Sequence, residues 1–181
     1  APWLDMEAQM RQRGIPLYSM ESRHELRDFD IIGVSLPYEL NYTNAVNLLH
    51  LAGLPPLAAE RRDDDPLVIA GGSGAYNPEP MADFFDLFII GEGEEALPEL
   101  VRAWADWKVT RADAPPSVGH SKAAFLQRAA QIPGVYVPAL YEAEYSPDGV
   151  LAQLRPLTAE APRRIVKRIV PKLPPAPTRL L

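Results

Sequence analysis

The chain has 181 residues, of which 47% are hydrophobic and none is cysteine, and its formal net charge is −6. This length suits one sizeable domain, or one domain with an appendage, and the hydrophobic content is enough for a packed core. The lack of cysteine excludes disulfides, thiolate zinc sites and cysteine-ligated iron–sulfur clusters within the chain. A negative charge disfavours nucleic acid as the main partner. No signal peptide and no run of ~18 apolar residues is visible, so we expect a cytoplasmic protein.

The basic residues are unevenly distributed. Residues 160–181 hold six of the 18 basic residues and one of the 24 acidic ones, so this segment carries +5 and the rest of the chain −11. Such a tail can be a nucleic-acid arm, or a solvated strand or linker that touches an acidic neighbour. We favour the second interpretation.

The first part of the chain reads as a helix followed by an extended stretch. The helix is expected over Met6 to Arg13 and is closed by Gly14. Residues 15–20 are expected to form a short extended stretch, and the proline near its start is typical of an edge strand. A helical turn is expected over 22–26.

A strand and a helix are predicted next. Residues 30–36 form an apolar run typical of a buried strand. A helix is predicted over 41–52 and ends at Gly53. Residues 57–66 are expected to form a loop or a helical turn, with a solvated charged run over 60–65.

Two further apolar runs, 67–70 and 87–90, each end in a glycine-rich turn. The turns are Gly71-Gly72-Ser73-Gly74 and Gly91-Glu92-Gly93-Glu94. Short, uninterrupted apolar runs are typical of strands buried in a parallel sheet, and the ligand crevice of such sheets lies at the carboxyl ends of the strands. Glycine lets backbone N–H groups come close to a ligand. Between the runs, Asn77-Pro78-Glu79-Pro80 is expected to cap a short helix and fix the loop.

The second turn leads into a helix that is expected to end at about Trp107. Its apolar residues share one predicted inward stripe: Ala96, Leu97, Leu100, Val101 and Trp104. A loop over 110–118 and a helix over 121–131, capped by Ser121, follow.

The remaining residues predict an appendage. Residues 135–154 read as a β-hairpin with its turn at Gly149, and 163–170 alternate basic and apolar residues and can add a strand. Four prolines between 171 and 177 are typical of a stiff linker.

Alternation of strands and helices up to residue 107 predicts an α/β fold with a doubly wound parallel sheet. A C-terminal helix and a β-hairpin are appended to this sheet. We accordingly divide the chain into an α/β domain over 1–107, an extension over 108–170 and a proline-rich linker over 171–181.

The motifs exclude several chemistries. Gly71-Gly72-Ser73-Gly74 is neither a Walker A loop nor a G-x-G-x-x-G turn, so nucleotide phosphate binding has little support. Glu94 and Glu95 can simply cap a helix N-terminus, or Glu92 or Glu94 can hydrogen-bond a polar ligand. No histidine accompanies these carboxylates, which disfavours a metal or glycosidase site. We expect no catalytic residues in this chain.

Four segments carry a family resemblance through their order and spacing. They are 30–35, 68–72, 77–80 and 89–94. Together they resemble the N-terminal cobalamin-binding domain of cobalamin-dependent radical SAM proteins. The amino-acid sequences of 36–44 and 75–80 resemble those of a bacterial branch often labelled Fe–S oxidoreductases. The sequence of 134–138 resembles the segment that leads to the radical SAM barrel. The resemblance covers about residues 1–175.

The resemblance implies a Rossmann-like, flavodoxin-like sheet of strand order 2-1-3-4-5, with cobalamin across the carboxyl ends of the strands. It also implies a following barrel in the same polypeptide, which binds a 4Fe-4S cluster and S-adenosylmethionine. The resemblance further implies that the corrin or its lower side is faced by Ser35, Leu36 and Tyr38. The remaining implied residues surround the nucleotide tail: Gly71, Gly72 and Ser73 approach it, Asn77 and Pro78 hold the loop, and Gly91, Glu92, Gly93 and Glu94 line the other side.

The chain departs from this family pattern in three ways. The barrel with its cysteines is absent, and so is the first, central strand, which is expected before Ala1. His50 and Gly53 supply half of the cobalt-ligand motif D-x-H-x-x-G, but Leu48 stands where aspartate is needed. We therefore expect base-off cobalamin with no protein histidine on cobalt. An edge left open by the missing strand would be covered by a homodimer or a rearranged strand.

Three functions are consistent with these observations. The leading hypothesis is a non-catalytic cobalamin-binding module of a radical SAM Fe–S enzyme, with the chain as a fragment of it. The alternative is a degenerate Rossmann-like scaffold or interaction domain that no longer binds cobalamin. An unrelated nucleotide-binding domain is disfavoured by the missing phosphate motifs.

Overall fold

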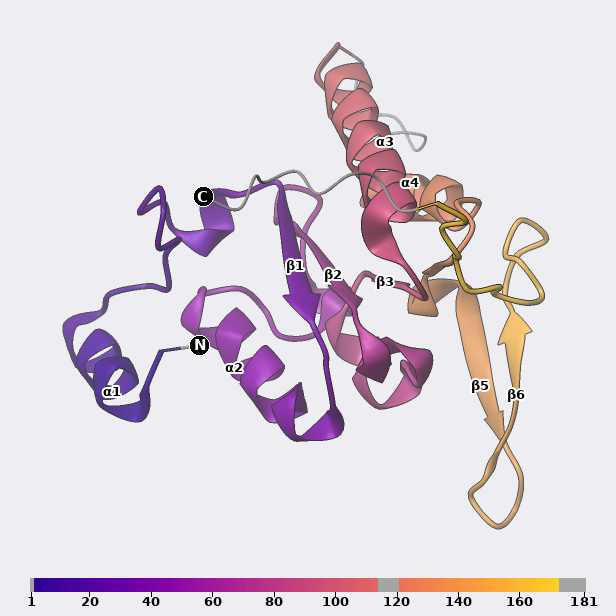
Figure 1. Ribbon diagram of the computed structural model, residues 1–181, viewed down its shortest axis with the longest axis horizontal. Coiled ribbons are helices and arrows are strands. Elements are labelled where there is room, and N and C mark those ends of the chain that lie inside the picture. The colour runs from indigo at the N-terminus through magenta and orange to yellow at the C-terminus, as the bar shows by residue number, and fades with distance from the viewer. Residues whose placement is uncertain (1, 114–120, 173–181) are drawn as a thin grey trace.

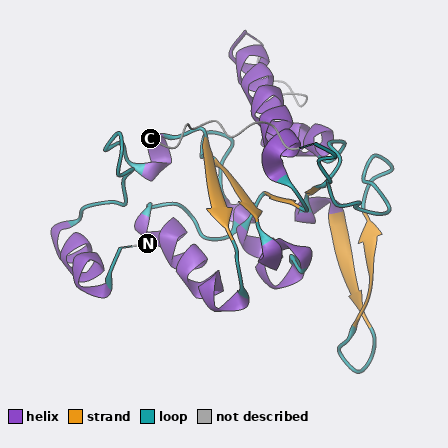
Figure 2. Cartoon of the chain, in the orientation of Figure 1, coloured by secondary structure: helices purple, strands orange, loops and turns teal. Residues whose placement is uncertain are grey.

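A four-stranded sheet forms the centre of the computed structural model, which describes residues 2–113 and 121–172 (Figure 1). The strand order is β1-β2-β3-β4, with β1, β2 and β3 parallel and β4 antiparallel to β3. The strands are β1 (Ile31–Ser35), β2 (Leu67–Gly71), β3 (Leu87–Ile89) and β4 (Val135–Tyr136). Figure 2 shows this sheet apart from a second sheet, which is a two-stranded hairpin.

The other elements surround the sheet. The helices are α1 (Leu4–Arg13), α2 (Tyr42–Leu51), α3 (Gly93–Asp113) and α4 (Lys122–Ala129), and the hairpin pairs β5 (Tyr141–Tyr145) with β6 (Leu151–Pro156). Short 3-10 helices cover Leu26–Asp28, Glu39–Asn41, Ala58–Glu60, Ser73–Tyr76, Glu79–Phe84 and Pro138–Leu140. No helix in the described ranges is both long enough and apolar enough to cross a bilayer.

The core has one layer on each face of the sheet. Because side chains alternate along a strand, Ile69, Leu87 and Ile89 pack with α3 and α4, whereas Val68, Ala70 and Phe88 pack with α2. The Trp104, Trp107 and Phe125 rings form the centre of the first layer. Helices on both faces confirm the predicted doubly wound α/β fold, and the β5–β6 hairpin confirms the predicted appendage.

Several predicted helix ends are confirmed and one is not. Gly14 ends α1 in the left-handed conformation (φ 64°), and the Ser121 hydroxyl accepts the Ala124 N–H at 3.2 Å at the start of α4. Asn77 makes no capping hydrogen bond to the 3-10 helix that begins at Glu79. The proline at its start fixes that turn instead.

Three strand predictions are wrong. Residues 15–20 form no strand; in this region only an isolated bridge joins Tyr18 to Glu25. Val135 and Tyr136 belong to the main sheet and not to the hairpin. Within 163–170 the backbone makes a single parallel bridge, between Gly91 and Arg168. The three parallel strands follow the 3-4-5 part of the implied order 2-1-3-4-5, whereas β4 is added antiparallel to β3 and no described strand pairs with the outer edge of β1.

Helix α3 also differs from its prediction. It continues to Asp113 and so includes the first residues of the predicted 110–118 loop; residues 114–118 of that loop lie outside the described ranges. Leu97 and Val101, expected in the inward stripe, are 40% and 45% exposed, while Trp107 is buried. The buried stripe thus runs through Ala96, Leu100, Trp104 and Trp107.

The charged loop at 57–66 is not fully solvated. Arg61 is buried and its guanidinium donates to the carbonyl oxygens of Pro55, Pro56 and Phe84 at 3.1, 2.9 and 2.9 Å. Its Nη2 also lies 3.5 Å from Oδ1 of Asp86, whose Oδ2 accepts the Val68 N–H at 2.7 Å. This network fastens the loop to the amino ends of β2 and β3.

Candidate functional site

An open apolar groove lies at the carboxyl ends of the three parallel strands, on the α3 side of the sheet. Its volume is about 310 Å³. The lining residues come from the strands, the turns that follow them and the start of α3: Gly33, Val34, Ser35, Ile69, Ala70, Gly71, Gly72, Ile89, Gly91, Gly93 and Leu97. The groove thus lies where open α/β sheets hold their ligands.

The groove exists because part of β1 is uncovered on this face. Gly33 and Ser35 are in register with Ile69 and Gly71 of β2 and point to the same face of the sheet. Both Gly33 and Ser35 are exposed, whereas Ile69 beside them is buried. Small residues on β1 and β2 therefore leave a hollow beside Leu97, at the start of α3.

Five of the predicted cofactor-binding residues line this groove: Ser35, Gly71, Gly72, Gly91 and Gly93. Leu36 does not, because its side chain is buried in the core on the α2 side. Tyr38 and Glu94 are exposed. The Ser73 hydroxyl donates to the Pro37 carbonyl oxygen at 2.6 Å, which ties the two exit loops together.

The other predicted residues lie elsewhere around this edge. Pro78 lines a separate cavity of about 240 Å³ beside Tyr136 and Tyr141, and Asn77 is exposed. The Glu92 carboxylate accepts the backbone N–H of Val170. Glu92 is thus occupied by the chain itself.

The glycines of the groove have two different roles. A Cβ at Gly33 or Gly71 would meet only the Ile69 side chain at 3.8 Å or the Ile89 carbonyl oxygen at 3.7 Å, and one at Gly93 would meet nothing within 4 Å. Side chains at these positions would therefore extend into open space. Gly72 differs, because its φ is 95° and a Cβ there would lie 3.0 Å from the Leu36 carbonyl oxygen. Gly72 is required by the turn.

Residues 163–170, which we call the strap, cross the sheet edge beside the groove. The Arg168 N–H donates to the Ile90 carbonyl oxygen at 2.8 Å, and the Glu92 N–H donates to the Arg168 carbonyl oxygen at 3.0 Å. A Cβ on Gly91, whose φ is 102°, would overlap the backbone of Arg168. Gly91 thus lets the strap approach the sheet edge.

Acidic side chains of α3 hold the basic strap. Arg168 Nη2 lies 2.6 Å from Glu95 Oε2 and 2.8 Å from Glu99 Oε1. The hydrogen bond from Arg168 to Glu95, followed by the nearby Glu99 charge, raises the pKa of Arg168. This contact confirms the favoured interpretation of the basic segment as one that touches an acidic neighbour.

No described histidine lies at the groove. His50 is in the last turn of α2, as predicted, with its Nδ1 3.2 Å from Nη1 of Arg11. His24 is exposed near the isolated Tyr18–Glu25 bridge, and His120 lies outside the described ranges. Within 2–113 and 121–172, no group of three or more His, Asp or Glu side chains is placed to hold a metal ion.

Sequence reasoning missed the residues that form the floor and one wall of the groove: Gly33, Val34, Ile69, Ala70, Ile89 and Leu97. Gly33 carried a usable signal. A glycine inside an otherwise apolar strand often marks a place where a ligand or another backbone approaches closely.

Comparison with known proteins identifies the family of this chain. The model for the N-terminal region of radical SAM proteins matches residues 1–138, more than half of the chain. The chain belongs to this family. A protein of Methanocaldococcus jannaschii, described as uncharacterised, is 31% identical over 85 residues, which make up 46% of this chain and 18% of that protein. No solved structure matches the chain.

The matched part of this radical SAM N-terminal domain thus spans less than a fifth of that relative. The sequence contains no cysteine, so this domain cannot itself supply thiolate ligands to an iron–sulfur cluster. Its groove contains backbone, glycine and aliphatic groups, with Ser35 as the polar side chain. Such a lining can bind and orient a large, partly apolar ligand but offers no nucleophile–base pair.

Proposed function

We propose that this domain is a non-catalytic module that holds cobalamin in the groove at the carboxyl ends of β1, β2 and β3. The observation that carries the proposal is the convergence of Ser35, Gly71, Gly72, Gly91 and Gly93 on one groove. These residues come from the carboxyl ends of three strands and the turns that follow them, and the resemblance to the cobalamin-binding family assigns all five to the cofactor. Membership in the radical SAM N-terminal family supports the same assignment.

The residues present fit part of such a ligand. The groove of about 310 Å³ is open, so a larger molecule can place one portion in it and extend beyond. Gly33, Gly71 and Gly93 keep the space free, because a side chain on each would project into it or into open solvent. Bound cobalamin would supply a cobalt centre able to carry and transfer an alkyl group.

The contribution of the domain is binding and orientation. Ile69, Ile89 and Leu97 would exclude water from the apolar part of the ligand, and the Ser35 hydroxyl would hydrogen-bond a polar substituent at the rim. No described histidine reaches the groove, and we propose that cobalt would be held without an imidazole from this domain. We propose that the 4Fe-4S cluster and S-adenosylmethionine are bound by a radical SAM barrel elsewhere in the same polypeptide.

The test is reconstitution of the longest natural protein that contains this chain with hydroxocobalamin. We expect retention of the corrinoid through gel filtration, with an absorption spectrum of the base-off form. After one-electron reduction, electron paramagnetic resonance should show no splitting from an axial nitrogen. Gly71→Val should abolish retention, because its side chain fills the groove without straining an ordinary backbone conformation.

Two control variants make this test specific. Ala152→Val introduces the same side chain on the exposed surface of β6 and should bind normally. His50→Ala should leave both retention and the spectrum unchanged. Normal binding by a folded Gly71→Val protein would refute the groove assignment. Failure of the parent protein to bind would favour the alternative, a scaffold or interaction domain that has lost the cofactor.

A further inference from the structure

A large cleft, which we call the hairpin cleft, lies between the β5–β6 hairpin, the start of α4 and the 3-10 helices over Ala58–Glu60 and Glu79–Phe84. Its volume is about 760 Å³, and it shares no lining residue with the groove. Six alanines from five different elements line it: Ala58, Ala59, Ala82, Ala123, Ala139 and Ala143. An apolar groove formed by side chains of several elements, and not by one free strand edge, is the kind that receives an amphipathic helix.

The hairpin turns an apolar face to this cleft. The face consists of Tyr141, Ala143, Tyr145 and Leu154. The opposite face is polar, because the Glu144 carboxylate there accepts hydrogen bonds from Gln153 and Arg155 at 2.5 and 2.9 Å. The hairpin therefore has the two-sided pattern of a ribbon that packs on another element through one face.

The apolar face is only partly covered by the rest of the domain. Tyr145 is 62% exposed, and Leu151, which pairs with it, is 38% exposed. In Figure 1 the tip of the hairpin projects beyond the rest of the chain. A two-stranded hairpin is at best marginally stable until its apolar face packs on a further element. We therefore expect the cleft and the hairpin tip to receive such an element.

Carboxylates without an ion pair determine the charge of this element. Asp63, Glu79 and Asp83 line the cleft, and no ion pair between described residues involves any of the three. The two cations of the lining, Arg61 and Lys122, are buried. The accessible charge of the cleft is thus negative, which favours lysine or arginine on the element that binds.

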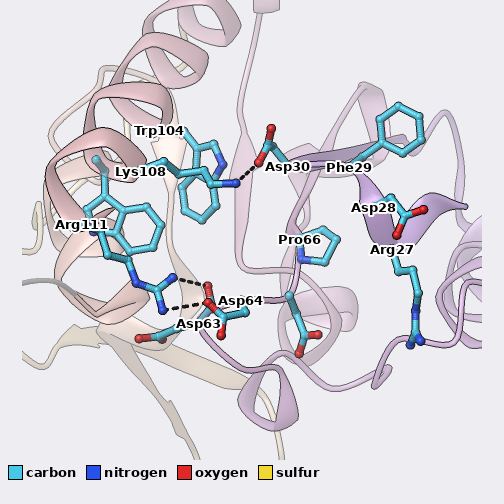
Figure 3. A pocket seen from close by; sticks show the side chains of 12 residues that line it. Arg27, Asp28, Phe29, Asp30, Asp63, Asp64, Pro66, Trp104, Lys108 and Arg111 are labelled. Atoms are coloured by element: carbon cyan, nitrogen blue, oxygen red, sulfur yellow. Dashed lines mark hydrogen bonds and ion pairs between the residues drawn. The ribbon is translucent and has the colours of Figure 1, made fainter. Parts of the chain in front are cut away.

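The cavity that precedes β1 and β2 differs in this respect (Figure 3). Its aspartates Asp30 and Asp64 are already paired with Lys108 and Arg111 of α3. These ion pairs leave it without a comparable attraction for a basic partner.

A second copy of the chain is disfavoured as the occupant of the hairpin cleft. The formal net charge is −6, so two copies repel each other. The basic strap is fastened to the sheet edge through Arg168 and is not helical. The family is defined as the N-terminal region of radical SAM proteins, and the matched part makes up 18% of the longer relative. These observations favour an occupant from elsewhere in the same polypeptide.

We propose that the hairpin cleft binds an amphipathic helix from another part of the same polypeptide. Its apolar residues, spaced i, i+3, i+4, would face the alanines, and its lysine or arginine residues would lie beside Asp63 and Asp83. The helix would cover the apolar face of the hairpin. The proposal rests on membership in the family and is independent of cobalamin binding.

Photo-crosslinking in the longest natural protein that contains this chain tests the proposal. Tyr145 on the apolar face and Gln153 on the polar face are replaced, one at a time, by p-benzoylphenylalanine. The probe at Tyr145 should crosslink within the same polypeptide, and mass spectrometry of the digest should place the crosslink in a segment with helical apolar spacing and flanking lysine or arginine. The matched probe at Gln153 should give no such product.

Variants connect this crosslink to the cleft. Ala123→Phe places a large side chain in the cleft and should abolish the Tyr145 crosslink, whereas Ala105→Phe, at an exposed alanine of α3, should leave it unchanged. Asp83→Asn should lower the crosslink yield, and the exposed Asp106→Asn should not.

Several results would overturn the proposal. They are a Tyr145 crosslink to a separate molecule, a crosslink to a segment without basic residues, and no crosslink at all. A crosslink unaffected by Ala123→Phe, in a protein with an unchanged circular dichroism spectrum, would also overturn it. Ala123 does not line the groove, so Ala123→Phe should still retain hydroxocobalamin, which separates failure here from failure of the proposed function.

Discussion

The backbone of Arg168 occupies the space that a side chain on Gly91 would need. Gly91 has a φ of 102°, and a Cβ there would overlap both the nitrogen and the carbonyl oxygen of Arg168. A Cβ on Gly134 would also lie only 2.9 Å from the Arg168 Cβ. Two glycines from different turns therefore form the channel through which the strap crosses the sheet edge.

Gly91→Ala should destabilise the protein and release the strap. The alanine would adopt a disfavoured backbone conformation and displace Arg168, at a combined cost of about 2–3 kcal/mol. Urea unfolding gives the free-energy change. Gly93→Ala is the matched control, because a Cβ there meets nothing within 4 Å, and its stability should stay within about 0.5 kcal/mol of the parent. Equal effects of the two variants would show that the strap does not need Gly91.

Removing the acidic partners of Arg168 should expose the strap to protease. In Glu95→Gln with Glu99→Gln, both carboxylate partners of the guanidinium are lost. We expect faster tryptic cleavage after Arg163, Arg164 and Lys167. The difference from the parent should shrink as salt rises from about 0.05 M to about 1 M, because screening weakens partly exposed ion pairs.

Glu94→Gln provides the matched control for this cleavage experiment. Glu94 is exposed on the same helical turn, but the ion pairs of Arg168 are made with Glu95 and Glu99 and not with Glu94. Cleavage should stay at the parent rate. A salt-independent difference in the double variant would argue that packing, and not charge, holds the strap.

Lys122→Met should stabilise the protein near neutral pH. Lys122 is 5% exposed, and its ammonium group has one long hydrogen bond, 3.4 Å to the Pro66 carbonyl oxygen. Burial lowers the pKa of Lys122 despite the nearby Asp86 charge. Replacement of such a buried charge by a side chain of similar volume should add about 1 kcal/mol. Urea unfolding at pH 7 measures this gain, and the exposed Lys167→Met should show none.

The gain from Lys122→Met should depend on pH in a defined direction. Below the lowered folded-state pKa the lysine is charged in both states, so the parent carries the full burial penalty. As pH rises toward the unfolded value of about 10.4, the folded state is already neutral and the penalty fades. Loss of stability in Lys122→Met at pH 7 would mean that attraction to Asp86 outweighs the cost of burial.

Tyr136→Phe should lower the free energy of unfolding at pH 7. It should also make this free energy fall less steeply than in the parent as the pH becomes alkaline. The Tyr136 hydroxyl donates to Glu79 Oε1 at 2.5 Å, and deletion of such a bond to a carboxylate costs about 1.5–3 kcal/mol. Burial, followed by the Glu79 hydrogen bond, raises the pKa of Tyr136 far above its usual range. Above about pH 10 an unfolded tyrosine ionises whereas Tyr136 stays protonated, so the parent loses stability as pH rises.

Phenolate absorbance at 295 nm and urea unfolding between pH 8 and 11, a window around the tyrosine reference value of about 10, test this expectation. The exposed Tyr145→Phe is the matched control and should change neither the stability nor its pH dependence. Ionisation of Tyr136 near its ordinary value would contradict the raised pKa.

Local signals in the sequence were sufficient for the parallel strands and for most helix ends. The apolar runs at 67–70 and 87–90, followed by glycine, predicted β2, β3 and the edge where the groove lies. Gly14 and Ser121 marked helix ends through their own backbone and side-chain chemistry. Such features depend on residues within a few positions of one another, so a single sequence contains them.

Long-range contacts were outside the reach of that reasoning. Arg61 looks solvated within a charged run, yet its buried partner Asp86 lies on another loop. Glu92 reads as a ligand group because nothing local shows that Val170 returns to it. The predicted stripe of α3 failed at Leu97, since helical periodicity does not reveal that the part of β1 beside it is left uncovered.

The position of the strap at the sheet edge also determines where any following part of the polypeptide would begin. Val170 is bound to Glu92, which lies between Gly91 and Gly93 of the groove, so the end of the strap lies beside the groove. A domain attached after the strap would be tethered to the ligand face at a high effective concentration. Contact between that domain and the ligand face would then depend on the tether, and the two surfaces would need little intrinsic affinity for each other.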